Sequence, residues 1–162
     1  MSSDPFSWRP VRAVDVPVLA TLYRAAAQRL GPLVYTLAQV KAWASFPDDA
    51  AGFRSYVLEA DTWIAERPGD LSALGFCGVS GEGDLREVHS LYVTPPSTRQ
   101  GIGGEMLRRS LQRAGSTGAK RFAAWVTPLS RPVFLGAGFE WTNTVSEPFA
   151  GTLFERYRVE RN

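Results

Sequence analysis

The chain has 162 residues, of which 44% are hydrophobic and 21% are charged, and 18 basic side chains stand against 16 acidic ones. This length suits one domain, and the composition indicates a globular protein that needs neither disulfides nor a metal to build its core. The net charge of +2 is too small to favour nucleic acid or an anionic membrane as the main partner.

Targeting signals and metal-binding patterns are not evident in the sequence. The first ten residues lack the apolar core of a signal peptide, and no stretch approaches the ~20 apolar residues that cross a bilayer. We therefore expect a cytoplasmic protein with no membrane and no nucleic-acid partner. The single cysteine, Cys77, lies in an apolar run typical of a buried strand. Together with the single histidine, His89, it supplies too few soft ligands for a zinc site, so we expect no metal.

The N-terminal part of the chain shows mostly helical periodicity. A strand is expected over 8–14, and Asp15 is a candidate cap for a helix that carries Pro17 in its first turn. Apolar residues recur at helical spacing from there to Gly31. Thr36 is a candidate cap for a second, short helix. Residues 50–59 fit one or two further helical turns.

From residue 62 the hydrophobic period changes to that of strands. The expected elements are strands over 62–66, 71–80 and 87–93, a helix over 103–114, a strand over 121–127, a short helix over 130–136, and a closing hairpin of 139–145 with 153–159. This order predicts one α/β or α+β domain over residues 1–162, with a sheet covered by helices.

The central feature is a glycine-rich loop, 98–104, between an apolar strand and a helix. Glycines without Cβ let main-chain N–H groups approach a phosphate closely. The helix N-terminus adds unpaired donors and about half a positive charge. A Gly-x-Gly pair alone is a weak signal, however, and also fits an ordinary tight turn before a helix.

Two other phosphate-binding motifs fit this loop less well. A dinucleotide-binding fingerprint needs a third glycine where this chain has Met106, and an acidic residue about twenty positions on. A P-loop needs Gly-Lys-Ser/Thr, which is absent.

Residues 87–93 followed by 98–103 resemble the central motif of the GCN5-related N-acetyltransferases. That family carries Gln/Arg-x-x-Gly-x-Gly/Ala after a strand that commonly ends in Leu-Tyr-Val. Gly101 and Gly103 match this pattern, whereas Thr98 stands at the Gln/Arg position. Residues 74–76 and 134–139 look like two further signatures of the family, so the resemblance covers most of the chain. Ala42-Trp43-Ala44 and Arg131-Pro132 look like a branch of small bacterial members.

The resemblance implies the GNAT fold: a mixed central sheet of about six to seven strands, splayed near its middle and flanked by about four helices. It also implies acetyl-CoA as cosubstrate, with pantetheine along the strand that ends at Val93 and a bulge aiming one N–H at the thioester carbonyl. The cofactor-binding residues it assigns are Leu91, Tyr92, Val93, Thr98, Arg99, Gln100, Gly101, Ile102, Gly103, Gly104, Thr127 and Phe134.

The expected catalytic residues are Glu87, His89 and Ser130. Amine acetylation needs a neutral amine, and Glu87 stands where the histone-modifying members of the family place their catalytic glutamate. In a strand, His89 points to the same face as Glu87, so the two are candidates for a relay; the alternative is a solvated Glu87 paired with a neighbour. The family's tyrosine acid is Phe134 here, which leaves Ser130 nearest to the expected sulfur, with Tyr92, Tyr35 and Tyr157 as other donors. A thiolate also leaves without a dedicated acid.

The acceptor site is expected between the first two helices and the last hairpin. The resemblance points to Tyr35 and Trp43 there, although core packing explains such aromatics equally well. The predicted activity is direct transfer of acetyl to the primary amine of a small molecule in a ternary complex. A CoA-binding module with little catalysis and a protein lysine or N-terminal acetyltransferase are the alternatives. Homodimers are common in the family, and the sequence leaves a homodimer open.

Overall fold

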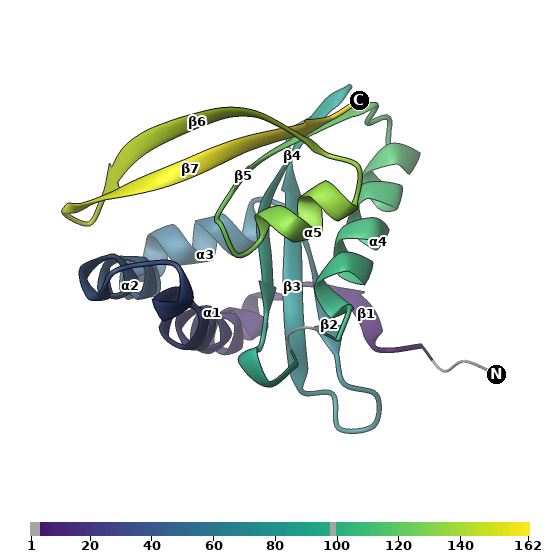
Figure 1. Cartoon of the computed structure of the whole chain (residues 1–162). Coiled ribbons are helices and arrows are strands. Elements are labelled where there is room, and N and C mark those ends of the chain that lie inside the picture. The colour runs from purple at the N-terminus through teal and green to yellow at the C-terminus, as the bar shows by residue number, and fades with distance from the viewer. Residues whose placement is uncertain (1–3, 98–99) are drawn as a thin grey trace.

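The computed structural model describes residues 4–97 and 100–162 (Figure 1). In these residues the helices are α1 (Val16–Leu30), α2 (Leu37–Ala44), α3 (Ala50–Leu58), α4 (Ile102–Ser116) and α5 (Arg131–Gly136). The strands are β1 (Ser7–Pro10), β2 (Asp61–Glu66), β3 (Ala73–Ser80), β4 (Leu85–Val93), β5 (Arg121–Val126), β6 (Glu140–Phe149) and β7 (Thr152–Arg161). Short 3-10 turns are η1 (Ala13–Asp15), η2 (Gly31–Leu33), η3 (Phe46–Asp48) and η4 (Pro95–Ser97). The mixed α/β architecture with a helix-covered sheet is therefore confirmed.

All seven strands belong to one sheet of order β1-β2-β3-β4-β5-β7-β6. Neighbouring strands are antiparallel except β4 and β5, which are parallel. This parallel pair is short, because only Leu85–Glu87 of β4 pairs with Arg121–Ala123 of β5. Beyond it the two strands separate, so the splayed middle of the sheet that the resemblance implied is present.

The sheet is covered on both faces (Figure 1), and each face has its own apolar core. On one face Met106 and Leu107 of α4 pack against Cys77 of β3 in a buried cluster. On the other, Leu19 of α1 and Phe53 of α3 belong to a second cluster. Burial of the predicted stripe of α4 explains why this helix lies flat on the sheet. Cys77 is fully buried, as its apolar run indicated.

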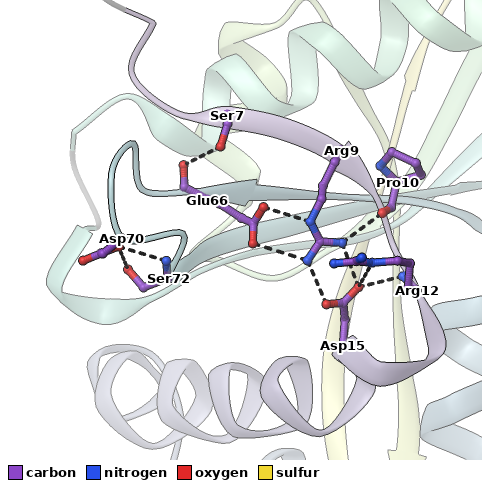
Figure 2. A network of polar contacts seen from close by, with 8 residues as sticks. All are labelled: Ser7, Arg9, Pro10, Arg12, Asp15, Glu66, Asp70 and Ser72. Carbon is purple, nitrogen blue, oxygen red and sulfur yellow. Dashed lines mark hydrogen bonds and ion pairs between the residues drawn. The ribbon is translucent and has the colours of Figure 1, made fainter.

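An ion-pair network around Arg9 links β1 to β2 and to η1 (Figure 2). Arg9 Nε lies 2.8 Å from Glu66 Oε1, and its Nη2 lies 2.8 Å from Asp15 Oδ1. The main-chain N–H of Arg12 donates to Asp15 Oδ2 at 2.7 Å. The expected capping role of Asp15 is therefore wrong, because its side chain makes no cap hydrogen bond to α1. The expected strand also ends earlier, at Pro10, where η1 follows.

Two local predictions can be checked against the hydrogen bonds. Thr36 does cap α2: its hydroxyl accepts from the Gln39 N–H at 3.2 Å, and Gln39 Oε1 accepts from the Thr36 N–H at 2.9 Å. The last hairpin is longer than expected. Its two strands are joined by Ala150 and Gly151, whose φ angles of 48° and 82° are those of a tight hairpin turn.

Candidate active site

The separation of β4 and β5 opens a cleft of about 1380 Å³ between α1, α2, α4 and α5. Many residues expected at the cofactor or acceptor site line it: Trp43, His89, Leu91, Tyr92, Val93, Gly101, Gly103, Gly104, Thr127, Ser130 and Phe134. Ile102 instead faces the core, where it is buried. Gln100 is exposed, and its side-chain amide lies 3.4 Å from the Pro96 carbonyl oxygen. Thr98 and Arg99 lie outside the described residues.

The start of α4 fits a diphosphate. Gly101 precedes the helix with φ 76°, a left-handed conformation that favours glycine. Among residues 4–97 and 100–162, a Cβ atom at Gly101 or Gly104 would meet no atom within 4 Å, and one at Gly103 would meet only Val93 Cγ2, at 3.5 Å. The N–H of Glu105 donates to the Gly101 carbonyl at 3.1 Å, whereas the N–H groups before it have no acceptor within the helix. The main chain therefore offers open space and donors where an anionic group would bind.

One edge of β4 is free along the cleft. From Val88 onward the strand keeps β3 on one side, but β5 no longer pairs with the other side. The register with β3 also shifts, because Gly78 faces Ser90 while Val79 faces Val88. His89 is thus the extra residue of a β-bulge, which confirms the bulge that the resemblance implied. Bulges redirect main-chain and side-chain groups next to active sites.

His89 is held by a reciprocal contact with Tyr56 of α3. The Tyr56 hydroxyl donates to the His89 carbonyl oxygen at 3.0 Å, and His89 Nε2 lies 2.9 Å from the Tyr56 carbonyl oxygen. The two rings stack with centroids 4.7 Å apart. Because a carbonyl oxygen only accepts, Nε2 carries a proton, and Nδ1 holds the lone pair when the ring is neutral. Burial lowers the pKa of His89, which favours this neutral form.

Glu87 is placed differently from the expected relay. Its Oε1 lies 3.2 Å from Arg158 Nη1 of β7, and 41% of its side chain is exposed. Within the described residues its hydrogen-bond partner is thus Arg158 rather than His89. Glu87 does not line the cleft, so a proton passing between it and an amine in the cleft would need a bridging water. Its expected catalytic role stays a prediction.

The end of β5 and the start of α5 form the opposite wall. The Thr127 N–H donates to Ser130 Oγ at 3.1 Å, and the Ser130 N–H donates to Thr127 Oγ1 at 3.2 Å. The two hydroxyl oxygens also lie 3.3 Å apart, and either can be the donor, so the Ser130 proton is available to a ligand when Thr127 donates to Ser130. Phe134 is buried and packs edge-to-face on Phe139, with ring centroids 5.1 Å apart. Phe134 is therefore an apolar wall of the cleft without a proton donor.

The two residues expected to bind the acceptor lie in different cavities. Trp43 lines the main cleft and also packs edge-on against Tyr23, with ring centroids 6.4 Å apart. It therefore contributes both to the cleft wall and to the hydrophobic core. Tyr35 lines a separate cavity of about 250 Å³ near the last hairpin and packs edge-on against Phe154. Tyr35 therefore does not line the main cleft, although its ring centroid lies 5.6 Å from that of Trp43, and its expected role in acceptor binding stays a prediction.

Metal-ligand clusters and membrane-spanning helices are both absent from residues 4–97 and 100–162. These residues contain no group of three or more His, Cys, Asp and Glu side chains placed to hold a metal ion. Every helix among them is too short or too polar to span a bilayer.

Comparison with known proteins assigns the family. Residues 33–134 match the model of the acetyltransferase (GNAT) family. The fold is shared with a GCN5-related N-acetyltransferase from Rhodopseudomonas palustris, with a TM-score of 0.90 and 23% identity over 99% of this chain and 98% of that one. The chain therefore belongs to the GNAT family and is an acyltransferase. No curated protein sequence matches it.

Two similar structures were determined with a cofactor bound. One is the PaiA N-acetyltransferase from Thermoplasma acidophilum in complex with coenzyme A, with a TM-score of 0.79 and 15% identity over 99% of both chains. The other is a phosphinothricin acetyltransferase from Sinorhizobium meliloti in complex with acetyl-CoA, with a TM-score of 0.72 and 18% identity over 98% of this chain and 88% of that one.

Proposed function

We propose that the protein transfers the acetyl group of acetyl-CoA to the primary amine of a small molecule, by direct attack in a ternary complex. The observation that carries this proposal is the continuous cleft that runs from the open glycines of α4, along the free edge of β4, to Leu30 of α1 and Trp43 of α2. Family membership and the CoA and acetyl-CoA complexes of two similar structures support it. A reaction that uses acetyl-CoA also agrees with the cytoplasmic location expected from the sequence.

The cofactor would be held mainly by main-chain groups. The N–H groups of Ile102, Gly103 and Gly104 would bind the diphosphate, since they open to the cleft at the positive end of the helix dipole. The free edge of β4 at 91–93 would pair with the pantetheine amides as an added strand does. A main-chain N–H at the bulge would then donate to the thioester oxygen as negative charge develops there.

Glu87, His89 and Ser130 would carry the proton transfers. The amine gives its proton to a base, attacks the thioester carbon, and forms the C–N bond as the C–S bond breaks. His89 lines the cleft, and its Nδ1 would be the basic nitrogen because Nε2 donates to the Tyr56 carbonyl; Glu87 would take the proton through water. The Ser130 hydroxyl, which lines the cleft, would donate a hydrogen bond to the departing sulfur.

The test combines binding and turnover. Purified protein is titrated with coenzyme A by calorimetry and is then assayed for thiol release from acetyl-CoA with a panel of small amines and peptides, the products being identified by mass. We expect binding together with an acetylated small amine. Binding without turnover on any amine or peptide would indicate a CoA-binding module, and turnover confined to peptides would indicate a protein acetyltransferase. Absence of CoA binding would overturn the proposal altogether.

A further inference from the structure

Two arginines of β7 lie over one aromatic residue of the cleft. Arg156 and Arg158 are two residues apart and therefore project from the same face of the strand. Their guanidinium carbons lie 5.7 Å and 5.2 Å from the ring centroid of Trp125. Trp125 lines the main cleft next to Thr127 and Ser130, where the thioester is expected. Trp125 thus links both positive charges to the cleft, since it lines the cleft and the two arginines pack on its ring.

The two arginines differ in how far their hydrogen-bonding groups are used. Arg158 contacts two carboxylates, Glu87 at 3.2 Å and Glu160 at 3.6 Å, and only 18% of its side chain is exposed. Arg156 contacts Glu147 alone, through Nη1 at 3.0 Å, and 45% of its side chain is exposed. A guanidinium carries five N–H donors, so Arg156 has the free edge that could bind another anion.

Arg156 is within electrostatic reach of the aromatic end of the cleft. Burial raises the pKa values of Tyr23, Tyr35 and Tyr92, and the positive charge of Arg156 acts in the opposite direction on all three hydroxyls. Tyr92 lines the cleft and Tyr23 packs against it, with ring centroids 4.7 Å apart. Arg156 therefore lies close enough to these hydroxyls for its positive charge to act at the aromatic end of the cleft.

The carboxylates near this end favour an anionic acceptor over a polycationic one. A polyamine would need acidic side chains free to bind its additional ammonium groups. Among the described residues, however, Glu87 is paired with Arg158 and Glu147 with Arg156. Glu155, which contacts the Tyr157 hydroxyl, lines the smaller cavity instead, so the charge next to Trp125 in the main cleft is the free part of the Arg156 guanidinium.

We infer that Arg156 binds an anionic group of the acceptor, and that the acceptor is an amine that also bears a carboxylate, with an apolar body against the aromatic side chains. This inference rests on the proposed acetyltransferase function and specifies its acceptor. A carboxylate matches the planar guanidinium through two parallel hydrogen bonds. The indole of Trp125 beneath the arginines holds them in place and excludes water from one side.

Matched substrate pairs test the role of the anion. L-phenylalanine is compared with phenethylamine, and L-leucine with 3-methylbutylamine, by kcat/KM for thiol release from acetyl-CoA. We expect each acid to exceed its decarboxylated partner at least roughly tenfold, the effect of one charge-assisted hydrogen bond. Aminoalkyl phosphonates and sulfonates in the same assay show whether the site prefers a carboxylate or any small oxyanion. An amine that equals or exceeds its acid would overturn the inference while leaving the acetyltransferase function intact.

Variants of the ion pair give the second readout. In Arg156→Gln the acid-to-amine ratio of kcat/KM should fall about 10- to 100-fold, mainly through KM for the acid, and Arg156→Lys should restore part of it. Glu147→Gln is the matched control, because it removes the partner of Arg156 and should keep or raise the preference for acids. An unchanged ratio in Arg156→Gln would contradict the inference.

A binding measurement separates failure of this inference from failure of the proposed function. The CoA-loaded protein is titrated with N-acetylphenylalanine and N-acetylphenethylamine, which are the two reaction products. Selective binding of the acid that is lost in Arg156→Gln would support the inference even with a slow enzyme. Equal binding of both products would overturn it, and unchanged affinity for coenzyme A in the variant shows that the protein remains folded.

Discussion

The two walls of the cleft are built by different means. On the cofactor side, the start of α4 and the free edge of β4 present main-chain groups, and their side chains mostly point elsewhere. On the side where we propose that the acceptor binds, side chains from distant parts of the chain position others: Tyr56 of α3 contacts His89, and outside the cleft lining Arg158 of β7 contacts Glu87. A site made of main chain depends on fold and glycines, whereas a site made of side chains depends on particular residues. Substrate choice can therefore change on one wall without disturbing the other.

The largest expected effect tests the main-chain wall. In Gly103→Glu, a long anionic side chain would enter the space over the α4 N-terminus, where only Val93 Cγ2 lies near the added Cβ. Like charges brought together there cost several kcal/mol, so we expect the Kd for coenzyme A in calorimetry to rise more than about 100-fold. Gly103→Ala is the control and should bind nearly as well, since its methyl group fits at 3.5 Å from Val93. Equal affinities of the two variants would show that the diphosphate binds elsewhere.

The next effect tests whether the acceptor wall carries the base. Glu87→Gln should lower kcat about 100-fold at pH 7, the size of a general-base contribution. The difference in kcat between Glu87→Gln and the parent enzyme should become smaller as the pH rises, because more of the amine is then neutral in solution. Glu160→Gln is the matched control, since Glu160 also contacts Arg158, at 3.6 Å, but lies on an exposed stretch of β7. A pH profile parallel to that of the parent enzyme would remove Glu87 as base and leave His89 as the candidate.

The same division explains how much the sequence could predict. The α4 loop, the apolar stripe of the helix and the strand before it are local patterns, so these three elements of the expected cofactor side could be predicted from the sequence, whereas the residues that bind the cofactor stay a prediction. Tyr56 could not be predicted, because its partner is 33 residues away and no local pattern marks the contact. Asp15 was misassigned for a different reason: its carboxylate accepts hydrogen bonds from the nearby Arg9 side chain and Arg12 N–H instead of from the first turn of α1.

The last hairpin shows a second limit of prediction. Its strands were expected over 139–145 and 153–159, but they extend to Phe149 and from Thr152, and the turn places Ala150 at a positive φ, which is unusual for a residue other than glycine. The hairpin instead continues to its tip, where the Leu153 carbonyl accepts from Gln39 Nε2 of α2 at 2.9 Å. This contact sets the hairpin beside α2, and Tyr35 is enclosed between them rather than in the main cleft.

A smaller effect is expected where a side chain supports the bulge. Tyr56→Phe removes the hydroxyl that donates to the His89 carbonyl at 3.0 Å. Loss of this largely buried hydrogen bond should lower the free energy of unfolding by about 1 kcal/mol and kcat about tenfold, because the bulge N–H loses its fixed direction. Thr21→Val is the control, since the Thr21 hydroxyl donates to the Pro17 carbonyl oxygen at 3.2 Å at an exposed position of α1. If kcat of Tyr56→Phe equalled that of the control, Tyr56 would have a structural role alone.

The smallest expected effect is a pH dependence of stability on the acceptor wall. Burial lowers the pKa of His89 below its ordinary value of 6.5, so the unfolded chain binds this proton more readily than the folded one. The contribution of neutral His89 is therefore present above pH 6.5 and is lost as the pH falls towards the pKa of the folded protein. Urea denaturation from pH 7.5 to 5.0 should show the parent losing more stability than His89→Gln, which keeps a side-chain N–H donor but does not titrate. Parallel losses in the two proteins would mean that His89 is not held neutral by the fold, and its proposed action from Nδ1 would lose its physical basis.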